Sequence, residues 1–285
     1  MKAPFLTTAA VVAALAALPF AATPARAIIG GSPVPAGDIA ARSSVLVVTG
    51  DANGCTGTLI GRRSVLTAAH CVAGARLAVI AFIRDARIVA LTPVVAAAGH
   101  PGVASPFGGT APIDVAVLTM RDLPPAGYGP ARIGSREPAP GSRVTIAGFG
   151  RQQLNSMRSA GQLRRVSLPV IQRSPSGYVA LGDRRRIVNG FGPSACQGDS
   201  GGPAFAGDAV VGVVSLVSGP PETRGCGQLT VTMPVVGIAP WIRSAVAAGE
   251  QRAPANPQVA VLPPPRAPER TGLPAWARID GGNPP

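Results

Sequence analysis

The stretch "SACQGDSGGPAF", residues 194–205, contains the densest group of special residues in the chain. It places Ser200 between an aspartate and two glycines, shortly after a cysteine. Three glycines within residues 198–202 favour a tight loop whose backbone amides approach another group closely. A serine in such a loop acts as a nucleophile only where the chain also supplies a base and an acid that orients the base. Without these partners, Ser200 is an ordinary solvated turn residue.

The chain offers two histidines as candidates for the base, His70 and His100. His70 follows an apolar run in "SVLTAAHCVAG" (64–74), whereas His100 lies in a loop rich in glycine and proline and is interpreted as a surface residue. Asp114 directly precedes the apolar run "VAVLTM", which predicts a buried carboxylate at the head of a strand. A buried carboxylate needs a hydrogen-bond donor, and an imidazole N–H would supply one.

The first 27 residues have the pattern of a secretory signal peptide. Lys2 gives a positive start, an apolar run follows, and "ARA" (25–27) supplies the small residues of a cleavage site. A membrane-spanning helix is disfavoured because the run is short and broken by Pro19. We therefore predict cleavage of 1–27, no membrane span afterwards, and a secreted or periplasmic protein.

The predicted export bears on the interpretation of the four cysteines, none of which form a C-x-x-C motif. In an oxidising compartment an even set of this kind favours two disulfides over a metal site. Three pairings are possible, and the spacing alone leaves all three open.

The chain is strongly basic, with a formal net charge of +13 over 285 residues. Such a charge is compatible with acidic partners, such as nucleic acid or an anionic cell surface. The basic residues are scattered except for "DRRR" (183–186), and aromatic residues make up only 4% of the chain. Because single-stranded nucleic acids bind by stacking on aromatic side chains, we predict no specific nucleic-acid binding.

Short, β-branched apolar runs separated by glycine, proline and aspartate extend over about 28–240. This pattern predicts an all-β barrel or sandwich. One amphipathic helix is predicted over 239–249. From residue 250 to 285 the proline-rich composition predicts a disordered tail.

Three motifs together resemble those of the chymotrypsin-like (trypsin-fold) serine proteases: "LTAAHC" (66–71), "DVAVL" (114–118) and "GDSGGP" (198–203). They occur in the family's chain order, and "IIGG" (28–31) is similar as well. The resemblance implies two antiparallel six-stranded β-barrels, about 28–135 and 136–238, followed by the C-terminal helix. The protease domain would span 28–249, and the composition favours a bacterial member of the family.

The resemblance also assigns roles to residues. Ser200 matches the nucleophile, His70 the general base and Asp114 the acid that orients His70. The backbone amides of Gly198 and Ser200 match the oxyanion hole. Ser215 matches a residue that helps to hold the aspartate and begins the strand that pairs with substrate.

Disulfides and a specificity pocket follow from the same resemblance. Cys55 would pair with Cys71, and Cys196 with Cys226. Three residues correspond to pocket positions: Ser194 at the base, Val217 at a position where a branched residue narrows the pocket, and Thr230 on the opposite wall. Such a pocket favours small or medium apolar residues before the scissile bond, with larger apolar residues as the alternative.

Activation is implied in addition. In the family a new N-terminal isoleucine folds inward, and its ammonium pairs with the aspartate before the serine. Here these groups are Ile28 and Asp199, and a cut after Ala27 would expose Ile28 directly.

The sequence thus predicts an exported serine endopeptidase that acts through an acyl-enzyme. We expect a monomer that acts on protein or peptide substrates with no cofactor and no metal. Two other functions stay open at this point: an inactive protease-fold protein that binds at the cell surface, and an esterase.

Overall fold

The structure is a computed structural model that describes residues 28–50, 54–102, 113–150, 161–174, 177–188, 191–221 and 225–253. The predicted signal peptide and the tail from residue 254 onward lie outside the described residues. No described helix is both long and apolar enough to cross a membrane.

The first half of the chain forms a closed barrel of six strands in the order β2-β3-β4-β7-β6-β5. All neighbouring strands in it are antiparallel. Its interior is filled by aliphatic side chains together with Phe82. The strands are β2 (Ser44–Thr49), β3 (Gly54–Leu59), β4 (Ser64–Thr67), β5 (Ala78–Arg84), β6 (Arg87–Gly99) and β7 (Ala116–Met120).

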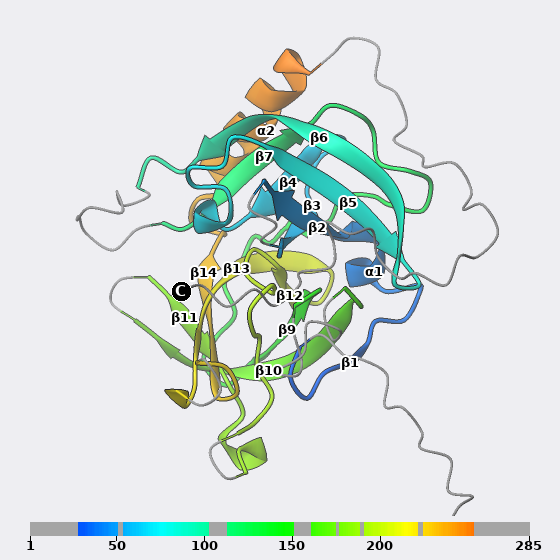
Figure 1. The fold of residues 1–285 in the computed structure, drawn as a ribbon. Coiled ribbons are helices and arrows are strands. Elements are labelled where there is room, and N and C mark those ends of the chain that lie inside the picture. Colours follow the sequence, from blue (N-terminus) through cyan, green and yellow to red (C-terminus); the bar gives the residue numbers. More distant parts are fainter. Residues whose placement is uncertain are drawn as a thin grey trace, which may run out of the picture.

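The second half forms another closed barrel, in the order β10-β11-β14-β13-β12-β9, and β9 pairs back to β10. The two barrels lie one above the other in Figure 1. They confirm the predicted fold of two six-stranded antiparallel barrels. The strands are β9 (Arg143–Gly148), β10 (Arg164–Arg173), β11 (Val179–Leu181), β12 (Pro203–Ala206), β13 (Ala209–Ser218) and β14 (Leu229–Pro234).

Two short strands that precede residue 135 pair with the second barrel and not with the first. β1 (Ser32–Pro33) runs antiparallel to β10, and β8 (Arg132–Ile133) runs parallel to β13. Ile28 is fully buried in the core of the second barrel. The barrel boundary predicted near residue 135 therefore does not match the strand pairing, because β1 and β8 precede it in the chain but pair with the second barrel.

The C-terminal helix, α2 (Ala239–Arg252), begins where the sequence predicts and extends beyond residue 249. It lies over β7 of the first barrel (Figure 1). A side chain at Gly249 would place its Cβ 2.1 Å from Thr119 Oγ1, so glycine allows the helix to approach the strand closely. The carboxylate of Glu250 accepts a hydrogen bond from the Arg63 amide at 2.8 Å, which attaches the end of α2 to the barrel.

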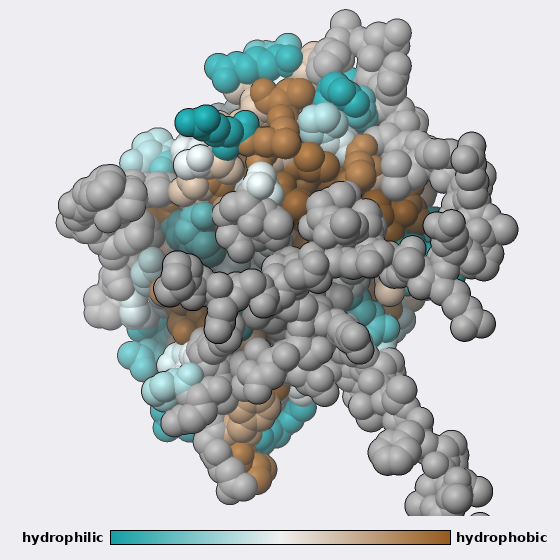
Figure 2. Space-filling view, viewed as in Figure 1, coloured by the Kyte–Doolittle hydropathy of each residue, from teal (hydrophilic) through white to brown (hydrophobic). Residues whose placement is uncertain are grey.

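The outer wall of the first barrel is partly apolar. Figure 2 shows hydrophobic residues gathered over the region of β5 to β7. Val95 in β6 is 46% exposed.

Within the described ranges, short helical turns connect the strands at α1 (Ile39–Ser43), η1 (Ala69–Cys71) and η3 (Arg184–Arg186). Asp38 caps α1, because its Oδ1 accepts a hydrogen bond from the Ala40 amide at 2.8 Å. The turn η1 carries His70 at the end of β4.

Candidate active site

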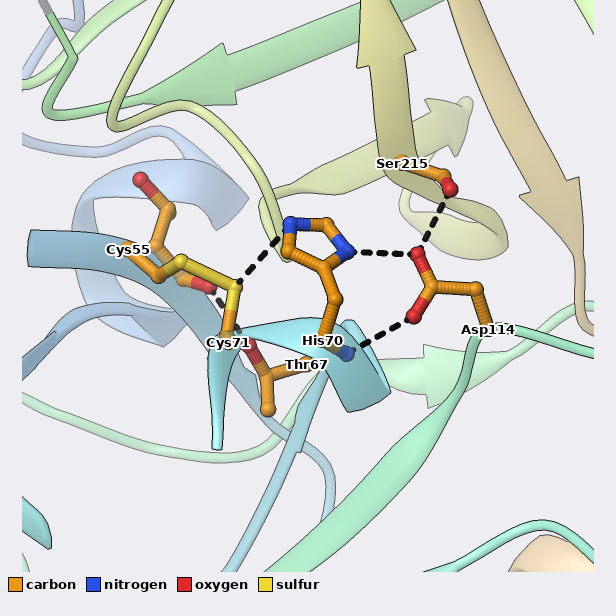
Figure 3. A network of polar contacts seen from close by, with 7 residues as sticks. Cys55, Thr67, His70, Cys71, Asp114 and Ser215 are labelled. Atoms are coloured by element: carbon orange, nitrogen blue, oxygen red, sulfur yellow. Dashed lines mark hydrogen bonds and ion pairs between the residues drawn. A yellow bond between two sulfur atoms is a disulfide. The ribbon is translucent and has the colours of Figure 1, made fainter. Parts of the chain in front are cut away.

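Strand pairing brings His70 and Asp114 together. β4 pairs with β7 so that Thr67 lies opposite Ala116, and these residues stand just before His70 and just after Asp114. His70 Nδ1 lies 2.7 Å from Asp114 Oδ2, and the His70 amide donates to Oδ1 at 2.9 Å (Figure 3). A neutral imidazole that donates from Nδ1 carries its lone pair on Nε2, which is the arrangement a general base requires.

Asp114 is largely buried and receives a third hydrogen bond, from the second barrel. The Ser215 hydroxyl donates to Asp114 Oδ2 at 2.6 Å, as Figure 3 shows. Burial by itself raises the pKa of Asp114, but the hydrogen bonds from His70 and Ser215 outweigh it and the pKa lies below its ordinary value. Asp114 is therefore an ionised carboxylate at neutral pH.

Ser200 lies in a turn that only glycine-rich sequence can form. Gly198 and Gly201 have φ angles of +93° and +81°, which disfavour other residues. A Cβ at Gly201 would lie 2.1 Å from Thr67 Oγ1 and 2.2 Å from Thr56 O. Because glycine has no side chain, the turn around Ser200 can pack closely against the first barrel.

Two backbone amides of this turn have no acceptor within the described chain, those of Gly198 and Ser200. Their neighbours are bonded: the Asp199 amide donates to Cys196 O at 3.0 Å, and the Gly201 amide to Val214 O at 2.7 Å. The two free donors are the ones that the sequence assigns to the oxyanion hole.

Among the described residues, no hydrogen bond joins the Ser200 hydroxyl to His70 Nε2. Such a contact is commonly long in an enzyme without substrate and shortens when substrate binds.

The two disulfides join Cys55 to Cys71 and Cys196 to Cys226. The first lies beside the imidazole, with Cys71 Sγ 3.8 Å from His70 Nε2 (Figure 3). Cys55, His70 and Cys71 form a group with the spacing of metal ligands. Both sulfurs are held in the disulfide, so the group has no thiolate to offer a metal.

The three predicted pocket residues lie together. Val217 in β13 is paired with Thr230 in β14. The Thr230 hydroxyl accepts a hydrogen bond from the Ala195 amide at 2.8 Å, next to Ser194. The Ser194 hydroxyl accepts from the Gly227 amide and donates to Ala195 O, both at 2.8 Å. Ser194 and Thr230 are fully buried, and their hydroxyls form hydrogen bonds with backbone groups. Both side chains are neutral, so they place no charge in this region.

Asp199 is fully buried directly behind the serine turn. Its Oδ1 accepts from the Gly150 amide at 2.8 Å and its Oδ2 from the Cys196 amide at 2.9 Å. Burial raises the pKa of Asp199 to about 7, although these two hydrogen bonds oppose the rise. No cationic group of the described residues forms an ion pair with it.

The N-terminal segment that would supply a cation lies inside the second barrel. Ile28 is fully buried with φ +51°, and Ile29 forms a bridge with Ser194 through hydrogen bonds of 3.0 and 3.2 Å. Ser194 belongs to the same loop as Asp199.

Sequence reasoning missed Thr56, which joins the serine turn to the first barrel. Its amide donates to Ser200 O at 2.8 Å, and its hydroxyl donates to Gly198 O at 2.8 Å. The hydroxyl also accepts from the Phe149 amide at 3.1 Å. The only signal in the sequence was its position next to Cys55, a cysteine expected near the histidine.

His100, interpreted from the sequence as a surface residue, is partly exposed and also packs against α2. Its ring packs edge-on against Trp241 at a centroid distance of 4.7 Å, and its Nδ1 accepts from the Gly102 amide. Burial lowers the pKa of His100. His100 is therefore a packing residue beside α2.

Two closed β-barrels, joined where His70 and Ser215 both hydrogen-bond Asp114 and with Ser200 in a glycine-rich turn, have the architecture of chymotrypsin-like serine proteases. The Trypsin family model matches residues 28–242. The chain belongs to this family and is a chymotrypsin-like serine endopeptidase.

Individual relatives agree with this assignment. The chain is 32% identical to serine protease SP24D of Anopheles gambiae over 67% of this chain and 71% of the relative. It is 27% identical to trypsin 5G1 of Aedes aegypti over 76% of this chain and 84% of the relative.

Among solved structures, neuropsin, a serine protease expressed in the limbic system of mouse brain, matches with a TM-score of 0.63. The alignment covers 76% of this chain and 99% of neuropsin at 19% identity, which supports the fold alone. These relatives come from animals, and the bacterial origin stays a prediction.

Proposed function

We propose that the protein is a secreted endopeptidase whose nucleophile is Ser200, whose general base is His70 and whose orienting acid is Asp114. The observation that carries this assignment is the 2.7 Å contact between His70 Nδ1 and a buried, ionised Asp114. That contact fixes the imidazole in the tautomer that leaves Nε2 free to accept a proton.

In this assignment the Ser200 hydroxyl oxygen attacks the carbonyl carbon of the scissile bond while His70 Nε2 takes the hydroxyl proton. His70 then gives the proton to the departing amine nitrogen, which leaves an acyl-enzyme. A water molecule, deprotonated by the same nitrogen, releases the acid and restores Ser200. Asp114 keeps its negative charge throughout and stabilises the imidazolium that forms at each step.

The oxyanion hole is assigned to the amides of Gly198 and Ser200. Both donors lack an acceptor in the described chain, whereas the amides of Asp199, Gly201 and Gly202 in the same turn are bonded. An oxyanion that forms on the substrate would accept from both. Loss of one donor of this kind lowers the rate by about 10²–10³.

For the residue before the scissile bond, we propose a preference for small or medium apolar side chains. The support is the uncharged Ser194 at the proposed base, the uncharged Thr230 on the proposed wall and the branched side chain of Val217, which is paired with Thr230. A basic substrate residue would find no carboxylate partner at these three positions.

Export and activation are proposed as one event. Removal of the predicted signal peptide 1–27 would leave a protease domain that begins at Ile28 and ends with α2 at Arg252, followed by the proline-rich tail. The new ammonium of Ile28 would supply the counter-charge that the buried Asp199 lacks within the described residues. N-terminal sequencing of the mature protein tests this: a fully active chain that starts elsewhere contradicts it.

Hydrolysis of a peptide library tests the endopeptidase assignment. We expect Ser200→Ala to abolish cleavage and Ser244→Ala, on the exposed face of α2, to leave it unchanged. Cleavage that persists in Ser200→Ala contradicts the assignment, and activity on esters alone would favour an esterase.

A further inference from the structure

A hollow of about 470 Å³ opens on the outside of the second barrel, away from the residues assigned to catalysis. We call it the arginine hollow. β9, β10, β1 and η3 contribute to its wall. Its lining residues are Gly30, Gly31, Ser32, Arg143, Thr145, Arg165, Val166, Ser167 and Arg186.

The register of the strands explains why polar side chains gather here. Thr145 of β9 lies opposite Ser167 of β10, and Ser32 of β1 lies opposite Arg165 of β10. Alternate residues of a strand point to the same face, so Arg165 and Ser167 share the outer face of β10. The residues between and beside them, Val166 and Leu168, face the core.

The lining carries three arginines and no acidic residue. Asp38 neutralises one of the arginines, because it forms an ion pair with Arg165. Arg143 and Arg186 have no acidic partner among the described residues. The hollow therefore contains two uncompensated guanidinium charges.

Neutral contacts hold both of these guanidinium groups in place. Arg143 Nε donates to the Ser167 hydroxyl at 3.1 Å and its Nη2 donates to Ser167 O, which leaves Nη1 without a partner in the described chain. Arg186 Nη2 donates to Gly30 O at 3.4 Å. The hydroxyls of Ser32 and Thr145 add two further groups with no partner among the described residues.

We infer that the arginine hollow binds a tetrahedral oxyanion, a phosphate or sulfate group. Guanidinium groups present paired N–H donors that match the oxygens of such anions, and hydroxyls supply additional donors. The hollow is large for a lone ion and lies within the ~300–1,000 Å³ range of small-molecule sites, so the group can be part of a larger anionic molecule. Binding here is a second function, independent of peptide hydrolysis.

The test uses the Ser200→Ala protein, which cannot digest itself, so the outcome does not depend on the catalytic assignment. Inorganic phosphate is titrated by ³¹P NMR at constant ionic strength set with chloride. A second arm titrates a short, fluorescently labelled sulfated oligosaccharide by anisotropy. Arg143→Gln and Arg186→Gln are compared with Arg87→Gln, an exposed arginine of the first barrel whose loss changes the net charge equally.

We expect saturable binding that weakens about tenfold or more in Arg143→Gln and in Arg186→Gln, and that is unchanged in Arg87→Gln. Binding of phosphate identifies a site for the free ion, whereas binding of the oligosaccharide alone, with the same arginine dependence, identifies a site for sulfate groups on a chain. The proposal is overturned if neither ligand saturates, or if Arg87→Gln weakens binding as much as the other two variants.

Discussion

The amide of Thr56 in β3 donates a 2.8 Å hydrogen bond to the carbonyl of Ser200, so the first barrel holds the serine turn of the second. The Thr56 hydroxyl adds to this contact between the barrels, because it donates a hydrogen bond to Gly198 O and accepts one from the Phe149 amide. The position of the Gly198 and Ser200 amides, which we propose as the oxyanion hole, therefore depends on a residue outside the sequence motifs around the histidine and the serine.

Thr56→Val should lower kcat by about tenfold or more and destabilise the fold by about 1–3 kcal/mol, because it leaves the buried Phe149 amide and the partly buried Gly198 carbonyl without their partner. Thr58→Val in the same strand is the matched control. The Thr58 hydroxyl is buried and has no hydrogen-bond partner in the part of the chain that the structure describes, so its loss should be neutral or stabilising. Steady-state kinetics and thermal melting of both variants decide, and equal effects on kcat would contradict the role of Thr56.

His70→Ala and Ser200→Ala should each reduce kcat by about 10³-fold or more while the thermal midpoint changes little. Because the two residues act in one proton transfer, the double variant should be scarcely worse than either single one. His100→Ala serves as control and should keep its turnover. If it proved as damaging as His70→Ala, the base would be wrongly assigned.

Stability should depend on pH through Asp199. In a chain that retains residues 25–27, no ammonium is available at Ile28, and the pKa of Asp199 lies at about 7 against an ordinary 3.8. Since the folded-state pKa is raised, the stabilisation is complete below pH 3.8 and is lost as the pH rises through about 7. A chain that begins at Ile28 should lose less stability over the same pH range, because its ammonium group stabilises the ionised form of Asp199.

Thermal melting from pH 4 to 8 measures this difference, with Asp199→Asn of the longer chain as control. The Asp199→Asn control should lack the decrease in thermal midpoint with rising pH that we attribute to Asp199. Superimposable profiles for the two chain lengths would show that Ile28 and Asp199 do not interact.

Val217→Gly should widen the pocket opposite Thr230 and raise kcat/KM for phenylalanine relative to alanine before the scissile bond by about tenfold or more. Leu77→Ala removes an aliphatic side chain that is 57% exposed in the first barrel, and it should leave the ratio unchanged. Competition between two matched peptides gives the ratio directly. A preference for arginine or lysine in the unmodified protein would refute the proposed pocket.

The sequence predicted the parts of this molecule that depend on local patterns. Apolar runs of β-branched residues identified the strands, and the residues around His70, Asp114 and Ser200 identified the family. The pairing of β1 and β8 with the second barrel was not predicted, because strands of two residues are too short to show the alternation of apolar and polar residues that indicates a strand. The contact between Thr56 and the serine turn spans more than 140 residues of chain, and no local pattern reports it.

The arginine hollow was also invisible in the sequence. Arg143, Arg165 and Arg186 belong to different elements: the register of β9 and β10 brings Arg143 and Arg165 to one face, and η3 adds Arg186. In the sequence they appear as part of a scattered basic charge.

The central claim is that His70 activates Ser200 as a nucleophile, and a fluorophosphonate adduct mapped by peptide mass spectrometry tests it most directly. We predict a single adduct, located on Ser200, that disappears in Ser200→Ala and forms about 10³-fold more slowly or less in His70→Ala. An adduct on another residue, or an unchanged rate of labelling in His70→Ala, would contradict the account.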